Sequence, residues 1–288
     1  MMELQLKNIG MIKEASVKLD GLTVIAGEND TGKSTVGKAV YAKITKKNIL
    51  ETLYNKESKV ELIYQEDIND LKDCTIFMET PIVWSFIQSR KQIALVESQY
   101  DIKLSFPTLM KDLIFKLEVK YKNSGIDIFD TIVNIIDGYF KQDKKGDFYF
   151  YKDTQQIELE NTAMGIKQFG ILQVLSKNGY LNSNTLLILD EPEVHLHPKW
   201  QLEMAKIIVE LVKNGVKIVV NSHSPYMIEA LERYAEKAKV TADFYLAEDG
   251  IIDKIDNNNS KTLAKIFNKL SAPYKTFDKM DSEILKYG

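Results

Sequence analysis

The sequence has very little cysteine and no long uncharged apolar run, and each absence excludes a class of protein. Cys74 is the single cysteine, so no internal disulfide and no cysteine-rich zinc site can form. Its neighbours Ile76 and Phe77 are apolar, which predicts a buried thiol that packs as a small hydrophobic group. Since the N-terminus also lacks an apolar signal region, we expect a cytoplasmic protein that does not contact a membrane.

The chain also lacks a large excess of either charge. Its formal net charge is −3, so no global basic field indicates a nucleic-acid partner. Internal repeats and sustained heptads are absent too, which excludes a long coiled coil. Local basic clusters remain, but a solvated surface is their simpler explanation. Their members are Lys43, Lys46, Lys47, Lys141, Lys144 and Lys145.

What the chain does contain is an alternation of strands and helices. Short apolar runs at 186–189 and 216–220 predict buried strands, each followed by a helix, the second of these over 225–236. This alternation predicts a mostly parallel sheet covered on both faces. At the N-terminus, apolar residues alternate between 4 and 19, which predicts a hairpin with Asn8, Ile9 and Gly10 in its turn, followed by a buried strand at 22–26.

Between about 50 and 160 the pattern is mixed and largely helical. Strands are predicted at 60–64, 75–78, 147–151 and 156–159, and helix over most of 82–138, with Pro107 at a helix start and Ser124-Gly125 at a break. We therefore expect a single domain over 1–288 with an insertion at about 50–160. A closing hairpin at 244–255 and a short helical cap at about 255–288 would complete it.

The segment GENDTGKS follows the predicted strand at 22–26 and precedes a predicted helix at 34–44. It fits the phosphate-binding pattern G-x-x-x-x-G-K-[ST], in which backbone N–H groups cradle the phosphates. Lys33 would place its charge on the phosphates, and the Ser34 hydroxyl would bind Mg²⁺. The strand–loop–helix context makes a bare glycine turn a poor explanation, because such a turn does not account for the Lys-Ser pair.

Two further predicted strands end in polar residues. Asp190 follows the apolar run LLIL and is placed to hold Mg²⁺, while Glu191 projects past the strand end, where it can polarise an attacking water. His223 follows the next strand and can hydrogen-bond a γ-phosphate. Ligands of open α/β sheets bind at the carboxyl ends of strands, which favours function over a solvated strand end.

His195 and His197 raise the question of a metal site. Two histidines at i and i+2 do not share a helix face, and no third protein ligand is evident nearby. A loop followed by a helix N-terminal cap is the better interpretation.

Taken together, these motifs resemble a known family. LKNIGMIKEASVKLDGLTVIAGENDTGKST resembles the N-terminal half of an ATP-binding-cassette (ABC) ATPase of the SMC/RecF type. LLILDEPEVHLHP followed by NSHSP is similar to the Walker B, D-loop and switch-histidine segments of the branch with the overcoming-lysogenization-defect (OLD) proteins and stand-alone ATPases of prokaryotic defence systems. The resemblance covers about 1–45 and 160–235. It implies an α/β P-loop NTPase fold: an ABC-ATPase-like head with N-terminal antiparallel strands, a central mostly parallel sheet and a helical insertion.

The resemblance also implies how such a protein works. Two heads form a head-to-tail homodimer around two ATP molecules with Mg²⁺, hydrolyse ATP to ADP and phosphate, and control a separate effector protein. Glu191, His223 and Lys33 would be catalytic, and Ser34 and Asp190 would bind the metal. The residues expected to contact ATP are Gly27, Glu28, Asn29, Asp30, Thr31, Gly32, Lys33, Ser34, Thr35 and, from the opposing subunit, Gly165.

The signature motif that would supply Gly165 departs from the transporter pattern. The candidate is NTAMGIKQFG, where transporter ATPases carry L-S-G-G-Q, so Thr162 or Lys167 would have to replace the missing serine. An ordinary turn before a helix is the competing interpretation. The glutamine loop is also open: Gln88 and Gln92 fall in the insertion, and Glu79-Thr80-Pro81 is an equal candidate.

Further absences narrow the family. Without heptads and paired cysteines, long SMC arms and a zinc hook are not expected, and residues 224–288 are too few for the TOPRIM nuclease of many OLD proteins. Two other functions stay open: a scaffold in which ATP joins subunits without turnover, and a DNA-repair head stimulated by DNA. Defence against phage is implied by the resemblance alone.

Asp30 places an acid inside the phosphate-binding loop. Because backbone N–H groups build the cradle, its side chain can point away from the phosphates. In a sandwich dimer it would face the partner subunit, so Asp30→Ala is expected to weaken dimerisation and to spare ATP binding in the monomer.

Overall fold

The computed structural model describes residues 2–64, 69–121, 125–272, 277 and 280. Its main sheet has the order β4-β1-β2-β12-β11-β3-β10-β9-β5 within this part of the chain. These strands are β1 (Met2–Ile9), β2 (Ile12–Lys18), β3 (Leu22–Ala26), β4 (Lys59–Tyr64), β5 (Thr75–Met78), β9 (Leu186–Asp190), β10 (Lys217–Ser222), β11 (Ala242–Glu248) and β12 (Ile251–Asp253). A second sheet contains β6 (Tyr139–Gln142), β7 (Phe148–Lys152) and β8 (Gln155–Glu158).

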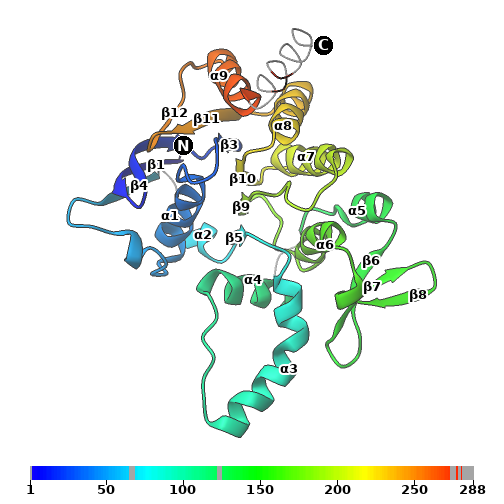
Figure 1. The fold of residues 1–288 in the computed structure, drawn as a ribbon. Coiled ribbons are helices and arrows are strands. Elements are labelled where there is room, and N and C mark those ends of the chain that lie inside the picture. Colours follow the sequence, from blue (N-terminus) through cyan, green and yellow to red (C-terminus); the bar gives the residue numbers. More distant parts are fainter. Residues whose placement is uncertain (1, 65–68, 122–124, 273–276, 278–279, 281–288) are drawn as a thin grey trace.

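The helices connect these strands and cover the main sheet (Figure 1). They are α1 (Lys33–Thr45), α2 (Asn69–Lys72), α3 (Val83–Tyr100), α4 (Thr108–Glu118), α5 (Phe129–Ile136), α6 (Met164–Lys177), α7 (Pro198–Lys213), α8 (Pro225–Ala238) and α9 (Ser260–Leu270). Single 3₁₀ turns occur at Glu51–Leu53 and Leu159–Asn161. The helix starts fit their sequences, because Pro198 and Pro225 each occupy the first turn, where a missing N–H costs nothing.

The centre of the sheet is parallel, as the sequence predicts. β9 pairs in parallel with β5 and β10, and β10 pairs in parallel with β3. Side chains of a strand alternate between the two faces. Leu186 and Ile188 therefore join the cluster with α1, while Leu187 and Leu189 join the cluster with α6, α7 and α8. Burial on both faces explains why this strand is apolar throughout.

The N-terminal hairpin is antiparallel, as expected, but its turn differs from the prediction. Ile9 is the last residue of β1 and is fully buried, so the turn falls at Gly10 and Met11. β4 then pairs antiparallel with β1 and forms the edge of the sheet. The segment at about 50–160 thus contributes two strands, β4 and β5, to the main sheet as well as helices.

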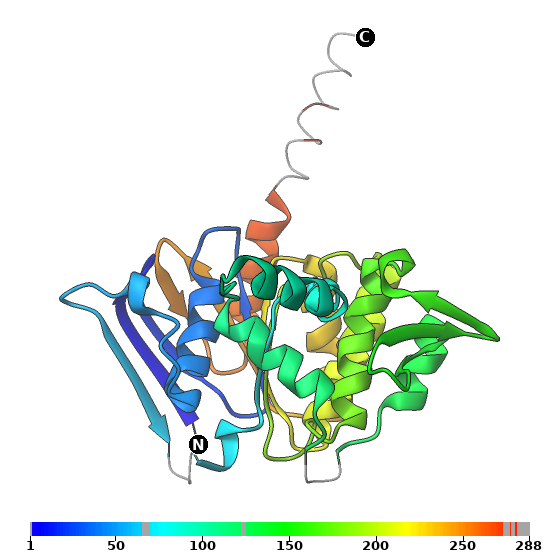
Figure 2. The same cartoon turned by 90° about the horizontal axis from the view of Figure 1, so that it is seen from below.

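The second sheet contains a strand that the sequence pattern does not reveal. β6 directly follows the predicted helical segment and is stabilised by distant aromatic residues. Phe140 stacks on Trp84 at 5.1 Å between ring centroids and packs on Phe150 at 5.3 Å. The Trp84 ring N–H donates to the carbonyl of Lys167, which ties α3 to α6. In Figure 2 this sheet lies at the end of the molecule opposite β1 and β4.

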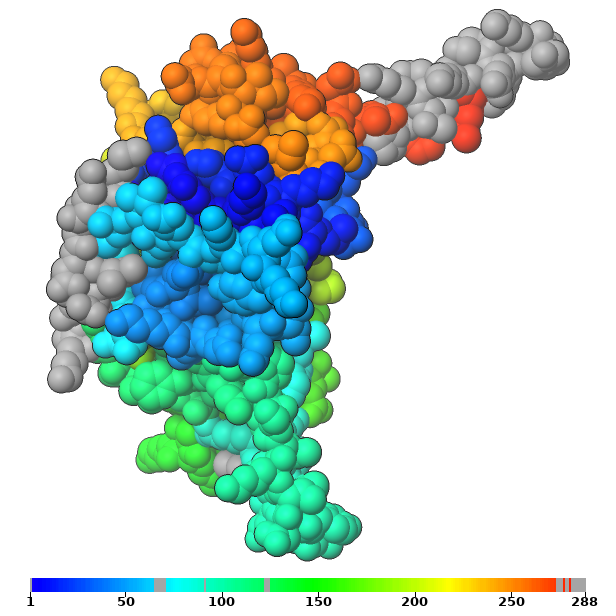
Figure 3. Space-filling model, turned by 90° about the vertical axis from the view of Figure 1, so that its left-hand side faces the viewer, coloured from blue at the N-terminus to red at the C-terminus, as the bar shows by residue number. Residues whose placement is uncertain are grey.

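Two peripheral parts complete the described structure. The end of α3 and the segment that leads to α4 project from the body, and Leu95 and Tyr100 there are more than half exposed (Figure 3). β11 and β12 form the expected antiparallel hairpin, and α9 provides the described part of the expected cap. Ser124 and most of 273–288 lie outside the described residues. Cys74 is fully buried, as predicted.

The described part of the chain contains no helix with both the length and the apolar composition that a membrane span requires.

Candidate nucleotide-binding site

The phosphate-binding loop connects β3 to α1, and close packing fixes its shape. A Cβ on Gly27 would lie 2.5 Å from the carbonyl oxygen of Ala247, so a glycine is required there. The Thr31 hydroxyl donates to the carbonyl of Glu28 at 2.9 Å, which closes the turn. Gly32 has a φ of 90° at the start of α1 and leaves the first N–H groups of the helix free for an anion.

Lys33 lies at the centre of this loop. Lys33 is 4% exposed, and its ammonium group donates a hydrogen bond to the carbonyl of Glu28 at 2.5 Å. Burial lowers the pKa of Lys33, and the nearby carboxylates of Glu191 and Asp190 oppose that shift. A buried cation held by a single carbonyl can turn toward a phosphate and form charge-assisted hydrogen bonds there.

Ser34 and Asp190 meet at the carboxyl ends of β3 and β9. The Ser34 hydroxyl donates to Oδ1 of Asp190 at 3.0 Å, across 156 positions of sequence. Asn221 lies opposite Asp190 in the β9–β10 register, and its amide donates to the same oxygen at 2.8 Å. Burial raises the pKa of Asp190, while the hydrogen bonds from Asn221 and Ser34 favour its charged form.

Glu191 and His223 form a second pair beside the first. Glu191 follows β9 with a φ of 51°, an uncommon conformation for a residue other than glycine. Its Oε1 lies 3.2 Å from Nδ1 of His223, and both side chains are between a third and two-fifths exposed. The pair therefore faces accessible space next to the loop, as a base and a phosphate sensor would require.

The comparisons with known proteins agree with this geometry. Residues 84–228, half of the chain, match the AAA ATPase domain family. The chain belongs to this family. The matched span includes Asp190, Glu191 and His223, whereas Lys33 and Ser34 of this AAA ATPase lie outside it.

Two curated relatives match part of the chain. The chain is 26% identical to the Septu protein PtuA of Bacillus thuringiensis over 117 residues, which is 39% of this chain and 27% of that protein. It is 29% identical to the Old nuclease of Escherichia phage P2 over 186 residues, which is 61% of this chain and 28% of that protein. The AAA ATPase thus matches less than a third of the length of either relative.

A solved structure shows the same fold. The Smc head domain of Pyrococcus furiosus, bound there to the C-terminal domain of ScpA, is 12% identical to this AAA ATPase with a TM-score of 0.50. The match covers 93% of this chain and all of that one. At this identity the likeness concerns the fold alone, and it agrees with the α/β P-loop ATPase head expected from the sequence.

Glu193 is a residue of this AAA ATPase whose role the sequence does not reveal. It is 4% exposed, and its Oε1 accepts hydrogen bonds from the Ser222 hydroxyl at 2.7 Å and from the backbone N–H groups of His223 and Ser224 at 2.9 and 3.2 Å. Burial raises its pKa, and these donors favour the charged form. Glu193 therefore fixes the backbone that carries His223. The only indication of Glu193 in the sequence is the motif EPE, which places a second acid two residues after Glu191.

Replacing Glu193 with alanine is expected to destabilise the protein by about 2–4 kcal/mol, because the Ser222 hydroxyl and the His223 N–H would lose their acceptor and the Ser224 N–H would keep only Ser222. Glu193→Gln should recover most of this loss, since an amide oxygen can accept the same hydrogen bonds. Denaturant unfolding measures the difference, with Glu210→Ala at an exposed position of α7 as the control. Equal stability of Glu193→Ala and wild type would contradict this role.

The wall opposite Asp190 contains one of the two candidates for the glutamine loop. A pocket of about 250 Å³ contains Ser34, Asp190 and Glu191, with Glu79, Thr80 and Pro81 after β5 on its other side. Gln168, on the first turns of α6, also lines it, and its buried Oε1 accepts no hydrogen bond from the described residues.

Gln88 and Gln92 lie in α3 and do not line this pocket. The parallel pairing of β5 with β9 explains why the Glu79 segment reaches the site.

The signature candidate starts α6. Gly165 is buried within its own chain, because a Cβ there would lie 3.0 Å from the His195 carbonyl oxygen and 3.1 Å from the Trp200 ring. Thr162 and Lys167 are each 6% exposed, and the Thr162 hydroxyl donates to the carbonyl of Glu158. The exposed residues of this segment are Asn161 and Ala163. Contact of Gly165 with a second subunit stays a prediction.

The two histidines after β9 have separate positions. His197 is the N-cap of α7, and its Nδ1 accepts a hydrogen bond from the N–H of Lys199 at 3.3 Å, as the cap interpretation predicts. His195 is exposed, has a φ of 67° and lines the pocket beside Glu191 and Asp190.

Proposed function

We propose that this AAA ATPase is an ATP-hydrolysing switch that forms a homodimer around ATP and controls a partner effector. The observation that supports it most directly is the convergence of Lys33, Ser34, Asp190, Glu191 and His223 at neighbouring strand ends. Each supplies a group that ATP hydrolysis needs: a cation, metal-binding oxygens, a base and a phosphate sensor.

Each residue has a defined part in the proposed reaction. Lys33 moves from the Glu28 carbonyl to the phosphates and neutralises their charge. Glu191 accepts a proton from the water that attacks the γ-phosphorus, and ADP leaves with the bridging oxygen. His223 hydrogen-bonds the γ-phosphate and contacts Glu191, so it responds to whether that phosphate is present. Glu193 maintains the position of His223 through the backbone.

The residues fit Mg²⁺, which would supply charge neutralisation between the β- and γ-phosphates. Ser34 Oγ and Asp190 Oδ1 already lie 3.0 Å apart, and the amide oxygen of Gln168 faces the same pocket without a donor. In the described part of the chain, histidine, cysteine and acidic side chains form no group of three or more that could hold a metal. Ser34 and Asp190 would therefore bind the ion together with phosphate oxygens and water.

The homodimer part of the proposal rests on exposed groups beside the site. Asp30 is exposed at a φ of 65° and makes no ion pair with the described residues. Asn161 and Ala163 are exposed at the start of α6. In a head-to-tail pair, the α6 start of one subunit would lie over the phosphate-binding loop of the other.

The proposals for the partner and for the biological setting are based on the relatives. The Septu protein PtuA and the Old nuclease are each more than three times as long as the part that this chain matches. An ATPase head that transmits its nucleotide state to an effector fits these relatives, and phage defence is the setting we propose for it. The state would be transmitted by the different affinity of the effector for the ATP-bound and ADP-bound forms.

The test of the switch is nucleotide-dependent dimerisation. ATP with Mg²⁺, but not ADP, is expected to shift the sedimenting species from monomer to dimer in analytical ultracentrifugation. Asp30→Asn should weaken that dimer about two- to fivefold, because it removes one docking charge at the subunit interface. Asparagine is chosen because alanine at this positive φ would add strain.

Asp153→Asn is the matched control, since Asp153 is also an exposed aspartate at positive φ, in the β7–β8 turn. A monomer at every ATP concentration would refute the sandwich. A stable ATP dimer without phosphate release would instead favour a scaffold, and DNA-stimulated turnover lost at high salt would favour a DNA-processing head. An Asp30→Asn dimer as tight as wild type would remove Asp30 from the interface.

A further inference from the structure

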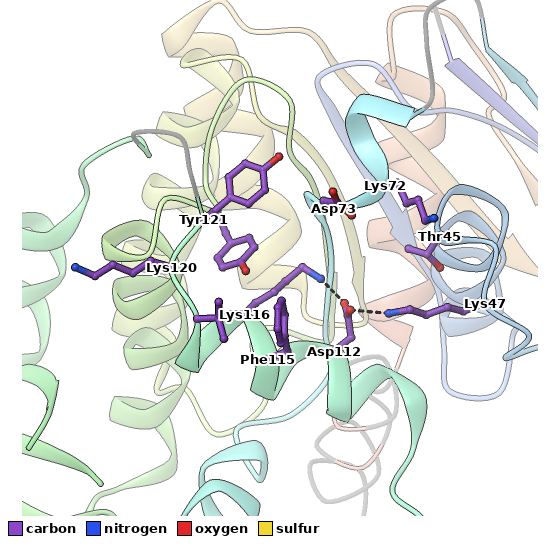
Figure 4. A pocket seen from close by; sticks show the side chains of 11 residues that line it. Thr45, Lys47, Lys72, Asp73, Asp112, Phe115, Lys116, Lys120 and Tyr121 are labelled. Carbon is purple, nitrogen blue, oxygen red and sulfur yellow. Dashed lines mark hydrogen bonds and ion pairs between the residues drawn. The ribbon is translucent and has the colours of Figure 1, made fainter. Parts of the chain in front are cut away.

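A second pocket lies at the end of the sheet opposite the nucleotide site. It has a volume of about 500 Å³ and is lined by the C-terminal end of α1, the residues just before β5, one side of α4 and Tyr180 (Figure 4). Pockets of this size accommodate small organic ligands. None of the residues assigned to ATP lines it.

The floor of this pocket is a buried ionic cluster. Asp112 accepts hydrogen bonds from Lys47 at 2.6 Å and from Lys116 at 2.5 Å, so each carboxylate oxygen has one lysine. The Lys116 side chain is 4% exposed, and burial lowers its pKa while Asp112 opposes the shift. Two ammonium groups thus share one carboxylate, one of them buried and the other, that of Lys47, with a side chain 36% exposed, and this leaves an excess of positive charge.

One further lysine, Lys72, adds to that excess. Lys72 and Lys120 line the pocket, and neither forms an ion pair with the described residues. Lys72 lies on the side of the pocket where Thr45 and Lys47 are, whereas Lys120 points away from the pocket (Figure 4). Asp73 is the only other acidic residue of the described lining, so the walls carry four lysines against two aspartates.

Aromatic rings form the remaining wall. Tyr121 and Tyr180 pack together with ring centroids 5.2 Å apart and planes tilted by 34°. Phe115 lines the same pocket and is 56% exposed, which is unusual for a phenylalanine on a helix that packs against the sheet. Flat ligands stack on such rings, and stacking contributes about 1–3 kcal/mol per base in proteins that bind single strands.

We propose that this pocket binds a mononucleotide or a similar small aromatic phosphate and thereby regulates the ATPase site. Lys72, Lys47 and Lys116 supply charge for the phosphate, and the rings supply a stacking surface for the base. Asp73 gives the pocket a preference for a ligand with hydroxyl or N–H donors, because a carboxylate repels a bare phosphate ion but accepts hydrogen bonds from a ribose.

Two elements connect this pocket to the ATP site. α1 begins at Lys33 in the phosphate-binding loop and ends at Thr45, which lines the second pocket about 20 Å away at 1.5 Å per residue. β5 follows Asp73 and ends just before Glu79, which lines the pocket beside Asp190. A ligand that shifts either element changes the ATP site, and ATP must then affect the ligand equally.

The binding test uses protein with Lys33→Ala, so that nucleotide binding through the phosphate-binding loop is weakened. AMP is expected to bind with one site per chain by isothermal titration calorimetry, and adenosine and inorganic phosphate should each bind more weakly. Adding Lys72→Ala or Phe115→Ala should weaken AMP binding about fivefold or more. Lys111→Ala, on an exposed position of the same helix α4, should leave it unchanged.

The outcomes separate this proposal from the proposed function. No saturable AMP binding, or equal binding with and without Lys72, would overturn the site even if ATP hydrolysis is confirmed. Inorganic phosphate binding as tightly as AMP would overturn the nucleotide part of the assignment.

The regulatory part has its own measurement. With Lys33 intact, AMP should change steady-state ATP turnover by a factor that Lys72→Ala abolishes. Inhibition that is the same in wild type and Lys72→Ala would mean competition at the ATP site and would overturn regulation from the second pocket.

Discussion

Glu191→Gln is expected to lower steady-state ATP turnover by about 100-fold or more, while ATP remains bound and holds two subunits together. A positioned general base contributes roughly 10²–10⁴-fold to a reaction, and an amide cannot accept the proton of the attacking water. The substitution is nearly isosteric, and its amide oxygen can still meet Nδ1 of His223, now 3.2 Å from the carboxylate. Binding should therefore survive the loss of chemistry.

Phosphate release measures the rate, and light scattering coupled to size exclusion measures the dimer. Glu210→Gln, on an exposed position of α7, is the control and should behave as wild type. Undiminished hydrolysis would assign the base to another residue. A partner that co-purifies with Glu191→Gln and ATP, but not with ADP, would identify the effector.

Lys33→Ala is expected to weaken ATP binding about 10- to 150-fold, because each charged hydrogen bond contributes about 1.5–3 kcal/mol. Lys33 is the only lysine in the described loop. The residue is 4% exposed, and its ammonium group contacts the loop carbonyl of Glu28. Without this positive charge, the repulsion between the phosphates and the carboxylates of Asp190 and Glu191 would be less well neutralised. Nucleotide-driven dimerisation should disappear at ATP concentrations that saturate wild type.

Titration with a fluorescent ATP analogue gives the dissociation constant. Lys43→Ala, an exposed lysine in the last turn of the same helix, is the matched control. A melting temperature close to that of wild type would show that Lys33→Ala is folded. Wild-type affinity in Lys33→Ala would refute the assignment of the loop.

The two variants should separate binding from chemistry. Lys33→Ala loses the nucleotide and so loses the dimer, whereas Glu191→Gln keeps the nucleotide and accumulates the dimer. The same behaviour in both variants would mean that one of the two residues acts only through folding.

The sequence by itself determined the parts of this protein that depend on neighbours in the chain. The run at 186–189 is apolar at every position because both faces of β9 are buried, and this pattern is visible without coordinates. The same holds for the strand–loop–helix around Lys33, for His197 as the cap of α7, and for the polar ends of β9 and β10. Ser34 and Asp190 were both expected to bind Mg²⁺, from the phosphate-binding pattern and from the acid that follows an apolar run, and they lie in hydrogen-bond contact.

The tertiary structure decided what depends on residues far apart in the chain. β6 is stabilised because Phe140 packs against Trp84 and Phe150. A strand of four residues is too short for its hydrophobic pattern to predict it. The packing of Gly165 against Trp200, which lies on another helix, is likewise not visible in the sequence.

The second pocket shows the same limit. Lys47 looked like a solvated lysine, yet it shares Asp112 with Lys116 at the floor of the second pocket. The position of Glu193 is likewise set by donors from β10 and from the residues that follow it. Burial and pairing of polar groups are properties of the assembled fold, because the free energy of a buried charge depends on every element packed around it.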